Sequence, residues 1–250
     1  MTDNLSTRGL FVTATDTGVG KTYLTSLIAR SLPRDQVRVG AYKPVCSGAE
    51  ISAEGGYYWT DIKKLTDAIG GDVDPLRICP QRLKAALAPP VAARIESVAL
   101  DFEAMKTAAD WWLGRVDVLL IEGVGGLLCP LTEDKTIADL AVALGYPLLV
   151  VARTGLGTIN HTLLTVEVAR QRGLQVAGVV LNEAEPLEES PGIGENGIEI
   201  ARRANVPVLG VVSYGSQFAE TGKGRLGPAD WLNLMATRES APAMTALRRI

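Results

Sequence analysis

Six short apolar runs, rich in β-branched residues, recur along the 250-residue chain, and each is followed by a turn and a helical pattern. The runs are LFVT (10–13), VRVGAY (37–42), VDVLLIE (116–122), PLLVVA (147–152), QVAGVVLN (175–182) and PVLGVV (207–212). Continuous apolar strands belong in a sheet that is covered on both faces, and alternation with helices is typical of parallel sheets. The pattern predicts an α/β fold with a mostly parallel sheet and helices on both faces.

Helix-period stretches fill the intervals between the runs. They include TYLTSLIARSL (22–32), DFEAMKTAADWWLG (101–114), TIADLAVALG (136–145), INHTLLTVEVARQRG (159–173) and ENGIEIARRAN (195–205). Several end in Gly or Asn, as helix C-termini commonly do. Segments 48–60 and 186–197 are expected to be exposed loops. No repeat, low-complexity tract or linker interrupts the pattern, so residues 1–250 are expected to form one domain.

Composition limits the classes of partner. The net charge is −3, with 47% hydrophobic and 21% charged residues, whereas nucleic-acid-binding domains usually carry a basic face. The sequence therefore predicts no nucleic acid and no membrane surface as a partner, and the basic end at 247–250 is expected to be a solvated tail. The longest uncharged apolar-rich run, 140–152, contains Gly145 and Pro147 and is shorter than the ~18 residues of a membrane span.

The N-terminus and the cysteines indicate a cytoplasmic protein. The first residues, MTDNLSTR, are polar and lack the apolar segment of a secretory signal. The cysteines are too few and too scattered for a disulfide framework, and they share no metal-ligand spacing: Cys46, Cys79 and Cys129. Reduced thiols are their expected state.

The stretch TATDTGVGKT follows the first apolar run and precedes a helical pattern. The phosphate-loop pattern G-x-x-x-x-G-K-[ST] ends correctly here, but Thr15 stands where its first glycine is expected. Gly18 and Gly20 allow close backbone approach to an anion at the helix N-terminus. Lys21 can reach outer phosphates, and the Thr22 hydroxyl can ligate magnesium. An incidental GKT in a plain turn is the alternative, but the strand–turn–helix context favours a nucleotide site.

Two other runs end in residues that suit the same site, because ligands of such sheets bind beyond the carboxyl ends of the strands. The third run ends in Glu122, followed by Gly-Val-Gly-Gly, and a carboxylate there can ligate magnesium. The second run is followed by Lys43. Taken alone, the glutamate could be merely solvated and the lysine merely an exposed turn residue.

With these segments in place, the chain resembles the dethiobiotin synthetases, ATP-dependent enzymes that close the ureido ring in biotin synthesis. The matching segments are TATDTGVGKT (13–22), YKPVCSG (42–48), Thr60-Asp61, LAPPVAARIE (87–96), IEGVGGLLCPL (121–131), GLGTINHTLLT (155–165) and VVLN (179–182). They span most of the chain in the family's order. The family's loop has one extra residue and its first glycine where Ala14 stands, so Ala14 is a departure, disfavoured if its φ is positive.

The resemblance implies a single-domain, P-loop NTPase-like three-layer fold and a homodimeric enzyme. Its substrates would be 7,8-diaminopelargonic acid, carbon dioxide and ATP with Mg²⁺, and its products dethiobiotin, ADP and phosphate. A substrate amine would become a carbamate and attack the γ-phosphate. The second amine would then close the ring on the mixed anhydride.

The resemblance also implies the site residues. Those acting in catalysis would be Lys21, Lys43 and Thr17. Those holding the nucleotide would be Gly18, Val19, Gly20, Lys21, Thr22 and Asn182, the last at the adenine edge. Those holding the substrate would be Ser47 and, through backbone N–H groups that serve the neighbouring subunit, Gly157, Thr158, Ile159 and Asn160. Those holding magnesium would be Thr22, Asp61 and Glu122. Without the family, Asp61 would pass as a helix-capping acid, and Thr17, Ser47 and Asn182 as turn residues.

Alternative interpretations stay open. A cobyrinic acid amidase synthetase domain would be accompanied by a glutaminase domain. A partition or division ATPase switch would carry a further lysine at the start of the loop, where this chain has Ala14. A nucleotide-binding regulatory paralogue is compatible with Ala14 and with the segment from Ser213, where similar enzymes usually carry a proline. The presence of the four residues Lys21, Lys43, Asp61 and Glu122 argues against it. His161 is expected to be structural, since no nucleophile partner is visible.

Overall fold

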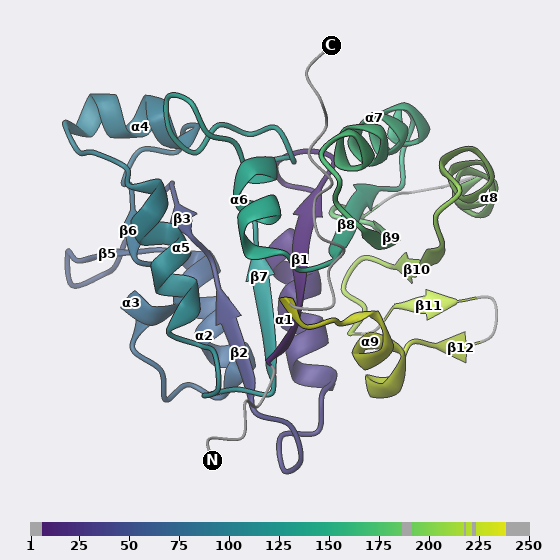
Figure 1. Ribbon diagram of the computed structural model, residues 1–250, viewed down its shortest axis with the longest axis horizontal. Helices are drawn as coiled ribbons and strands as arrows, with labels where there is room; N and C mark the ends of the chain where they lie inside the picture. The colour runs from purple at the N-terminus through teal and green to yellow at the C-terminus, as the bar shows by residue number, and fades with distance from the viewer. Residues whose placement is uncertain (1–6, 187–191, 218, 222–223, 239–250) are drawn as a thin grey trace.

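The computed structural model describes residues 7–186, 192–217, 219–221 and 224–238 (Figure 1). Its main sheet has the strand order β12-β11-β10-β9-β8-β1-β7-β2. The strands are β1 (Arg8–Ala14), β2 (Val39–Tyr42), β7 (Val118–Glu122), β8 (Leu148–Arg153), β9 (Val176–Asn182), β10 (Val208–Val212), β11 (Glu220–Thr221) and β12 (Gly224–Arg225). The six predicted runs are the six strands that pair in parallel, while β11 and β12 pair antiparallel at one edge. The predicted mostly parallel sheet is confirmed.

Helices flank the sheet on both faces (Figure 1). They are α1 (Lys21–Ser31), α2 (Thr60–Ile69), α3 (Pro75–Ile78), α4 (Pro89–Glu96), α5 (Phe102–Asp110), α6 (Ile137–Leu144), α7 (Thr158–Gln171), α8 (Ile193–Ala204) and α9 (Pro228–Leu234). Each helical stretch named from the sequence is confirmed, with boundaries that differ by a few residues.

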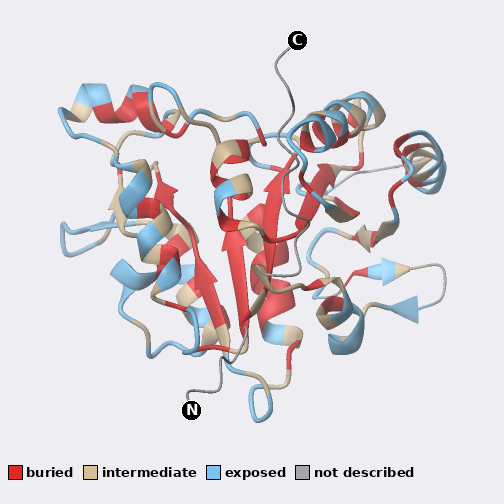
Figure 2. Ribbon diagram, viewed as in Figure 1, coloured by how far each residue is buried: buried red, intermediate tan, exposed pale blue. Residues whose placement is uncertain are grey.

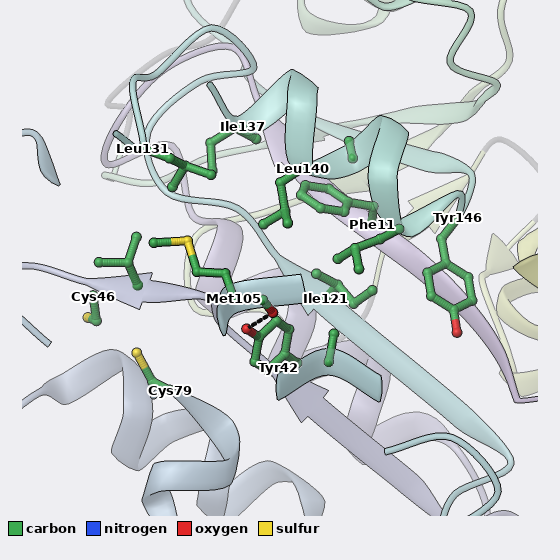
Figure 3. Close-up of a cluster of buried hydrophobic side chains, with 14 of the residues drawn as sticks. Phe11, Tyr42, Cys46, Cys79, Met105, Ile121, Leu131, Ile137, Leu140 and Tyr146 are labelled. Carbon is green, nitrogen blue, oxygen red and sulfur yellow. Dashed lines mark hydrogen bonds between the residues drawn. The ribbon is translucent and has the colours of Figure 1, made fainter. Parts of the chain in front are cut away.

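Successive residues of β1 point to opposite faces, as strand geometry requires. Phe11 packs in one apolar cluster with Ile121 of β7 and Leu140 of α6 (Figure 3). Leu10 packs in another with Leu24 of α1. The central strands are therefore buried on both sides (Figure 2), which explains why their sequences are continuously apolar.

The two segments expected to be loops contain regular structure. Within 48–60, β4 (Glu50–Ile51) and β5 (Tyr57–Tyr58) form a short antiparallel hairpin whose residues are exposed, and α2 begins at Thr60. Within 186–197, α8 already begins at Ile193, whereas 187–191 lie outside the described residues. The interpretation of both segments as plain loops is wrong in part. A further short pair, β3 (Val45–Cys46) with β6 (Gln81–Arg82), follows the end of β2.

The strand order determines where the site forms. Because β7 lies between β1 and β2, the turns that follow these three strands meet at the same edge of the sheet. The phosphate loop, the segment after Glu122 and the segment from Lys43 are these turns. The N-terminal residues 1–6 and the basic end at 247–250 lie outside the described residues.

Candidate active site

The phosphate loop connects β1 to α1, and its backbone explains two of its glycines. Gly18 has φ of 75° and Gly20 has φ of 96°, both in the left-handed region that favours glycine. A Cβ atom on Gly20 would also lie 2.1 Å from Nδ2 of Asn182. Ala14 is the buried last residue of β1, and its φ is not positive. The departure from the family pattern at Ala14 is therefore compatible with this backbone.

Lys21 is buried at the start of α1, and its Nζ donates a hydrogen bond to the carbonyl oxygen of Asp16 at 3.1 Å. Burial, together with the nearby ammonium of Lys43, lowers the pKa of Lys21 to about 8, although the carboxylates of Glu122 and Asp61 oppose the shift. Among the described residues, Lys21 has this carbonyl partner but no carboxylate within ion-pair distance, so an approaching anion would stabilise its buried ammonium.

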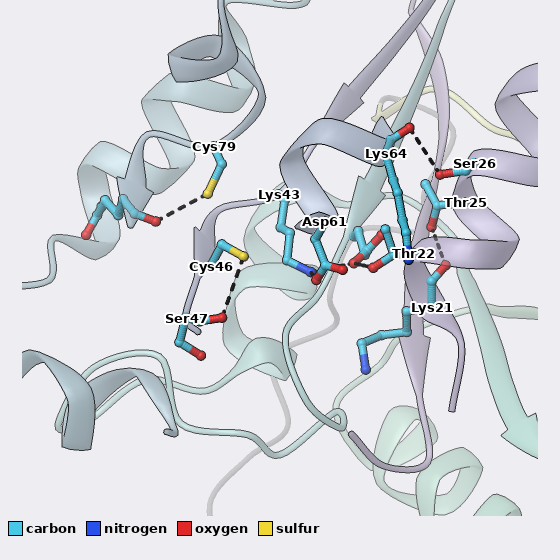
Figure 4. A network of polar contacts seen from close by, with 12 residues as sticks. Lys21, Thr22, Thr25, Ser26, Lys43, Cys46, Ser47, Asp61, Lys64 and Cys79 are labelled. Atoms are coloured by element: carbon cyan, nitrogen blue, oxygen red, sulfur yellow. Dashed lines mark hydrogen bonds and ion pairs between the residues drawn. The ribbon is translucent and has the colours of Figure 1, made fainter. Parts of the chain in front are cut away.

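Lys43, Asp61 and Glu122 form a compact charged cluster with Thr22. Figure 4 shows Lys43, Asp61 and Thr22 side by side. The Nζ of Lys43 lies 2.5 Å from Oε1 of Glu122 and 2.6 Å from Oδ2 of Asp61. The Thr22 hydroxyl donates to the same Glu122 oxygen at 2.7 Å. Burial opposes the charged form of Lys43, but the two carboxylates outweigh it and raise its pKa. Burial likewise opposes the charged form of Asp61, and Lys43 and Thr22 outweigh it and lower its pKa.

The oxygen atoms of this cluster fit a magnesium ion. Glu122 is fully buried, and its Oε2 has no hydrogen-bond partner among the residues that the structure describes. Magnesium is usually bound by one or two carboxylates, with waters and substrate phosphates supplying the remaining ligands. Within the described part of the chain, no three His, Cys, Asp or Glu side chains gather as a metal group. Two carboxylates and the Thr22 hydroxyl, beside a phosphate loop, therefore suit a metal that arrives with a nucleotide.

A cavity of about 400 Å³ connects the loop with this cluster. Its lining includes the predicted site residues Thr17, Gly18, Gly20, Lys21, Thr22, Lys43, Ser47 and Asp61. Lys64 was not predicted from the sequence, and it lines the same cavity three residues after Asp61 on α2. That spacing places both side chains on one helix face, and it was the available signal. Cys46 also lines the cavity, and burial raises the pKa of its thiol to about 12.

Asn182 lies beneath the phosphate loop. Its Nδ2 donates to the carbonyl oxygen of Val19 at 2.9 Å, and its buried Oδ1 has no partner among the described residues. With Thr17, Gly18 and Val19 it lines a second cavity of about 380 Å³, which is also lined by Arg153 at the end of β8. Part of the amide therefore stabilises the loop, and its recognition of adenine stays a prediction.

The segment 157–160 lies apart from the charged cluster. Gly157, with φ of 92°, precedes α7, and neither cavity is lined by residues 157–160. The Thr158 hydroxyl donates to the carbonyl oxygen of Arg153 at 2.5 Å. Leu156 at the tip is fully exposed. His161 Nδ1 is buried without a partner in the part of the chain that the structure describes. A single chain thus brings together the loop and the cluster, but not this segment.

The parallel sheet, the phosphate loop and the carboxylates that face it define a P-loop NTPase-like α/β protein. A ParA family ATPase from Chlorobium tepidum TLS has a similar structure, with a TM-score of 0.52 over 84% of each chain, at 12% sequence identity. At that identity the likeness supports the fold alone. Residues 8–221 match the family model described as an AAA domain.

Sequence comparison identifies the family within this class. An ATP-dependent dethiobiotin synthetase, BioD, from Anaeromyxobacter dehalogenans (strain 2CP-C) is 43% identical over 217 residues, which cover 86% of this chain and 94% of that protein. Another, from strain 2CP-1 / ATCC BAA-258, is 46% identical over 196 residues, or 78% and 85% of the two chains. The chain belongs to the dethiobiotin synthetase family.

Proposed function

We propose that this protein is an ATP-dependent ligase that converts 7,8-diaminopelargonic acid and carbon dioxide to dethiobiotin, with ADP and phosphate as the other products. One observation carries the proposal beyond family membership. The phosphate loop, two buried lysines and Asp61 line a single cavity of about 400 Å³, and the buried Glu122 lies directly behind it, paired with Lys43. Such a site suits a reaction that brings an anionic substrate to the phosphates of ATP.

The first step joins an amine of the substrate to carbon dioxide and releases a proton, which gives a carbamate anion. Lys43 supports this anion as a fixed positive charge rather than as a base, because its raised pKa keeps it protonated. Ser47 lines the same cavity and offers a hydroxyl to the carbamate.

In the second step, a carbamate oxygen attacks the γ-phosphorus and the bond to ADP breaks. Lys21 and the backbone N–H groups of residues 18–22 bind the phosphates and stabilise the charge that develops on them. The Thr17 hydroxyl donates to the transferred group. Thr22, Asp61 and Glu122 would hold Mg²⁺, which neutralises phosphate charge when it is bound. The second amine then attacks the carbonyl carbon of the anhydride, closes the ring and expels phosphate.

We infer that the enzyme is a homodimer in which the loop 157–160 binds the substrate carboxylate for the neighbouring subunit. The exposed apolar side chains of this region support a protein contact. Leu156 is 100% exposed and Leu164, on α7, is 58% exposed. Exposed apolar residues of this kind are available for burial in an interface. A dimer would bring the loop to a charged cluster from which it is separated within one chain.

We further infer that residues 1–250 act as one domain in the cytoplasm. The eight-stranded sheet, which joins strands from β1 to β12, supports a single unit. The three cysteines are free, as in reducing compartments. None of the helices that the structure describes combines the length and apolar composition of a membrane span. No nucleic-acid partner is proposed.

A product assay tests the reaction. Purified protein is incubated with diaminopelargonic acid, bicarbonate, Mg²⁺ and ATP, and dethiobiotin is measured by mass spectrometry. Lys43→Ala should abolish the product, whereas Lys63→Ala, an exposed lysine on the same helix as Asp61, should retain it. Wild-type protein that binds ATP and forms no dethiobiotin would refute the proposed function.

A further inference from the structure

Asp16 lies inside the phosphate loop and is held at three points. Its Oδ2 lies 2.8 Å from Nη2 of Arg153, the last residue of β8. Its Oδ1 accepts a hydrogen bond from the backbone N–H of Thr17 at 2.7 Å. Its carbonyl oxygen accepts from Nζ of Lys21 at 3.1 Å. A carboxylate so close to a site for a polyanion is unfavourable for binding unless its charge is balanced.

We propose that Arg153 is a positioning residue, which neutralises Asp16 and fixes its side chain so that the loop accepts the triphosphate of ATP. The proposal rests on the proposed function, because it takes ATP as the ligand. Arg153 lines the cavity of about 380 Å³ together with Thr17, Gly18 and Val19 of the loop. The two side chains of the pair are 42% and 53% exposed. Ion pairs this exposed contribute little to the free energy of unfolding. We therefore expect substitution of Arg153 to change the affinity for ATP rather than the stability of the fold.

Arg153 also connects the loop to the segment inferred to bind substrate. Its carbonyl oxygen accepts the hydrogen bond from the Thr158 hydroxyl at the start of α7. One residue thus contacts the phosphate loop through its side chain and the beginning of α7 through its backbone. Loss of the side chain removes the first contact and leaves the second, so substitutions of Arg153 should affect ATP more than diaminopelargonic acid.

A direct bond from Arg153 to a phosphate is the rival role, because a guanidinium binds phosphate well and Nε of Arg153 has no partner among the described residues. The two roles differ in one respect. If Arg153 only neutralises Asp16, it becomes dispensable once Asp16 has lost its charge. If it binds phosphate, it remains necessary.

A double-mutant cycle separates these roles. The affinity for ATP with Mg²⁺ is measured by calorimetry for the wild type, Arg153→Gln, Asp16→Asn and the double variant. We expect Arg153→Gln to weaken binding about tenfold and the double variant to recover to within about threefold of the wild type. The KM for ATP should rise in Arg153→Gln while kcat changes less than twofold. The matched control is the exposed pair Arg38–Asp117, at 2.7 Å, whose Gln and Asn variants should bind ATP as the wild type does.

Each other outcome has a definite meaning. Arg153→Gln with wild-type affinity would overturn the proposal. A double variant as weak as Arg153→Gln would overturn neutralisation in favour of direct phosphate binding. Thermal unfolding of each variant shows whether a loss of ATP affinity comes from misfolding. A loss that comes from misfolding would also overturn a role confined to ATP binding. If the wild-type protein makes no dethiobiotin, the proposed function is refuted. If it makes dethiobiotin but all variants bind ATP equally well, only the role of Arg153 is refuted.

Discussion

The charged cluster and the segment 157–160, which is proposed to serve it from the neighbouring subunit, are built in opposite ways. The charged cluster is enclosed: the side chains of Lys43 and Glu122 are 4% and 0% exposed and lie 2.5 Å apart. The segment 157–160 follows Leu156, which is fully exposed, and lines neither cavity of the site. A buried charged cluster keeps its geometry within one chain, because separating its charges would leave each of them buried without compensation. The exposed Leu156 beside the segment 157–160 has no such partner within one chain among the described residues, so this region is where a second surface is expected to pack.

The largest effect is expected from breaking the cluster at Lys43. Lys43→Met should lower kcat at least ~10³-fold, because it removes a preorganised charge at the reacting groups. It should also lower the free energy of unfolding by about 3–5 kcal/mol, since Glu122 is left buried without its cation. Chemical denaturation and the product assay measure the two effects.

A companion variant separates chemistry from stability. In Lys43→Met/Glu122→Gln the buried charge is gone, so most of the lost stability should return while activity stays absent. If the double variant were no more stable than Lys43→Met, the buried carboxylate would not be the cause of the destabilisation. Lys63→Met, on the exposed face of α2, serves as the control for a lysine substitution as such.

The shared site can be tested by mixing two damaged enzymes. Asn160→Asp places a negative charge in the loop inferred to bind the substrate carboxylate, and we expect KM for diaminopelargonic acid to rise at least tenfold. After subunit exchange with Lys43→Met, about a quarter of all sites should be intact, because half of the dimers carry one sound site. Lys43→Met mixed with Glu122→Gln should recover nothing, since both changes lie in one cluster. Equal recovery from both mixtures, or none from either, would contradict a shared site.

Much of the fold was predictable because a strand that is buried on both faces has apolar residues at successive positions. The central strands are covered on both faces, so their sequences are continuously apolar, and all six were predicted. The short hairpin of Glu50–Ile51 with Tyr57–Tyr58 was missed for the same reason, because exposed strands carry no such pattern. The proline-initiated helix Pro89–Glu96 was recognised only as a family segment and not as a helix.

The site was predictable only in part. Lys43 follows β2 and Glu122 is the last residue of β7, and these strands are neighbours in the sheet, so the rule that ligands bind at carboxyl ends indicated both. The pair of Asp16 with Arg153 joins residues that are 137 positions apart. It depends on β8 lying next to β1, a strand order that the apolar pattern does not specify. Lys64 could be assigned to the site only if the start of α2 was known, because its position beside Asp61 depends on the helix.

Two glycines of the loop provide a finer comparison between an enclosed and an open position. Gly18→Ala should cost about 1–2 kcal/mol in the free energy of unfolding, because φ is 75° and the added Cβ meets no atom within 4 Å. Gly20→Ala should cost about 3 kcal/mol or more, since the same strain is joined by overlap with the buried amide of Asn182. Urea denaturation of both variants checks the difference. Equal costs would show that Asn182 moves away freely.

The smallest expected effect is the uptake of a fraction of a proton by Lys21 when ATP binds. Its pKa of about 8 in the unliganded protein leaves about half of the molecules neutral there at pH 8, whereas bound phosphates favour the ammonium. ATP binding at pH 8 should therefore take up about half a proton, and affinity should fall as the pH rises above 8. The stability of the unliganded protein should respond with the opposite sign. The pKa of Lys21 is lower in the folded state than the ordinary 10.5, so its contribution rises between pH 8 and 10.5. Calorimetry in buffers of different ionisation enthalpy measures the uptake, and Lys21→Met should abolish it. Uptake that persists in Lys21→Met would assign the proton to another group and weaken the case that burial prepares this lysine for phosphate.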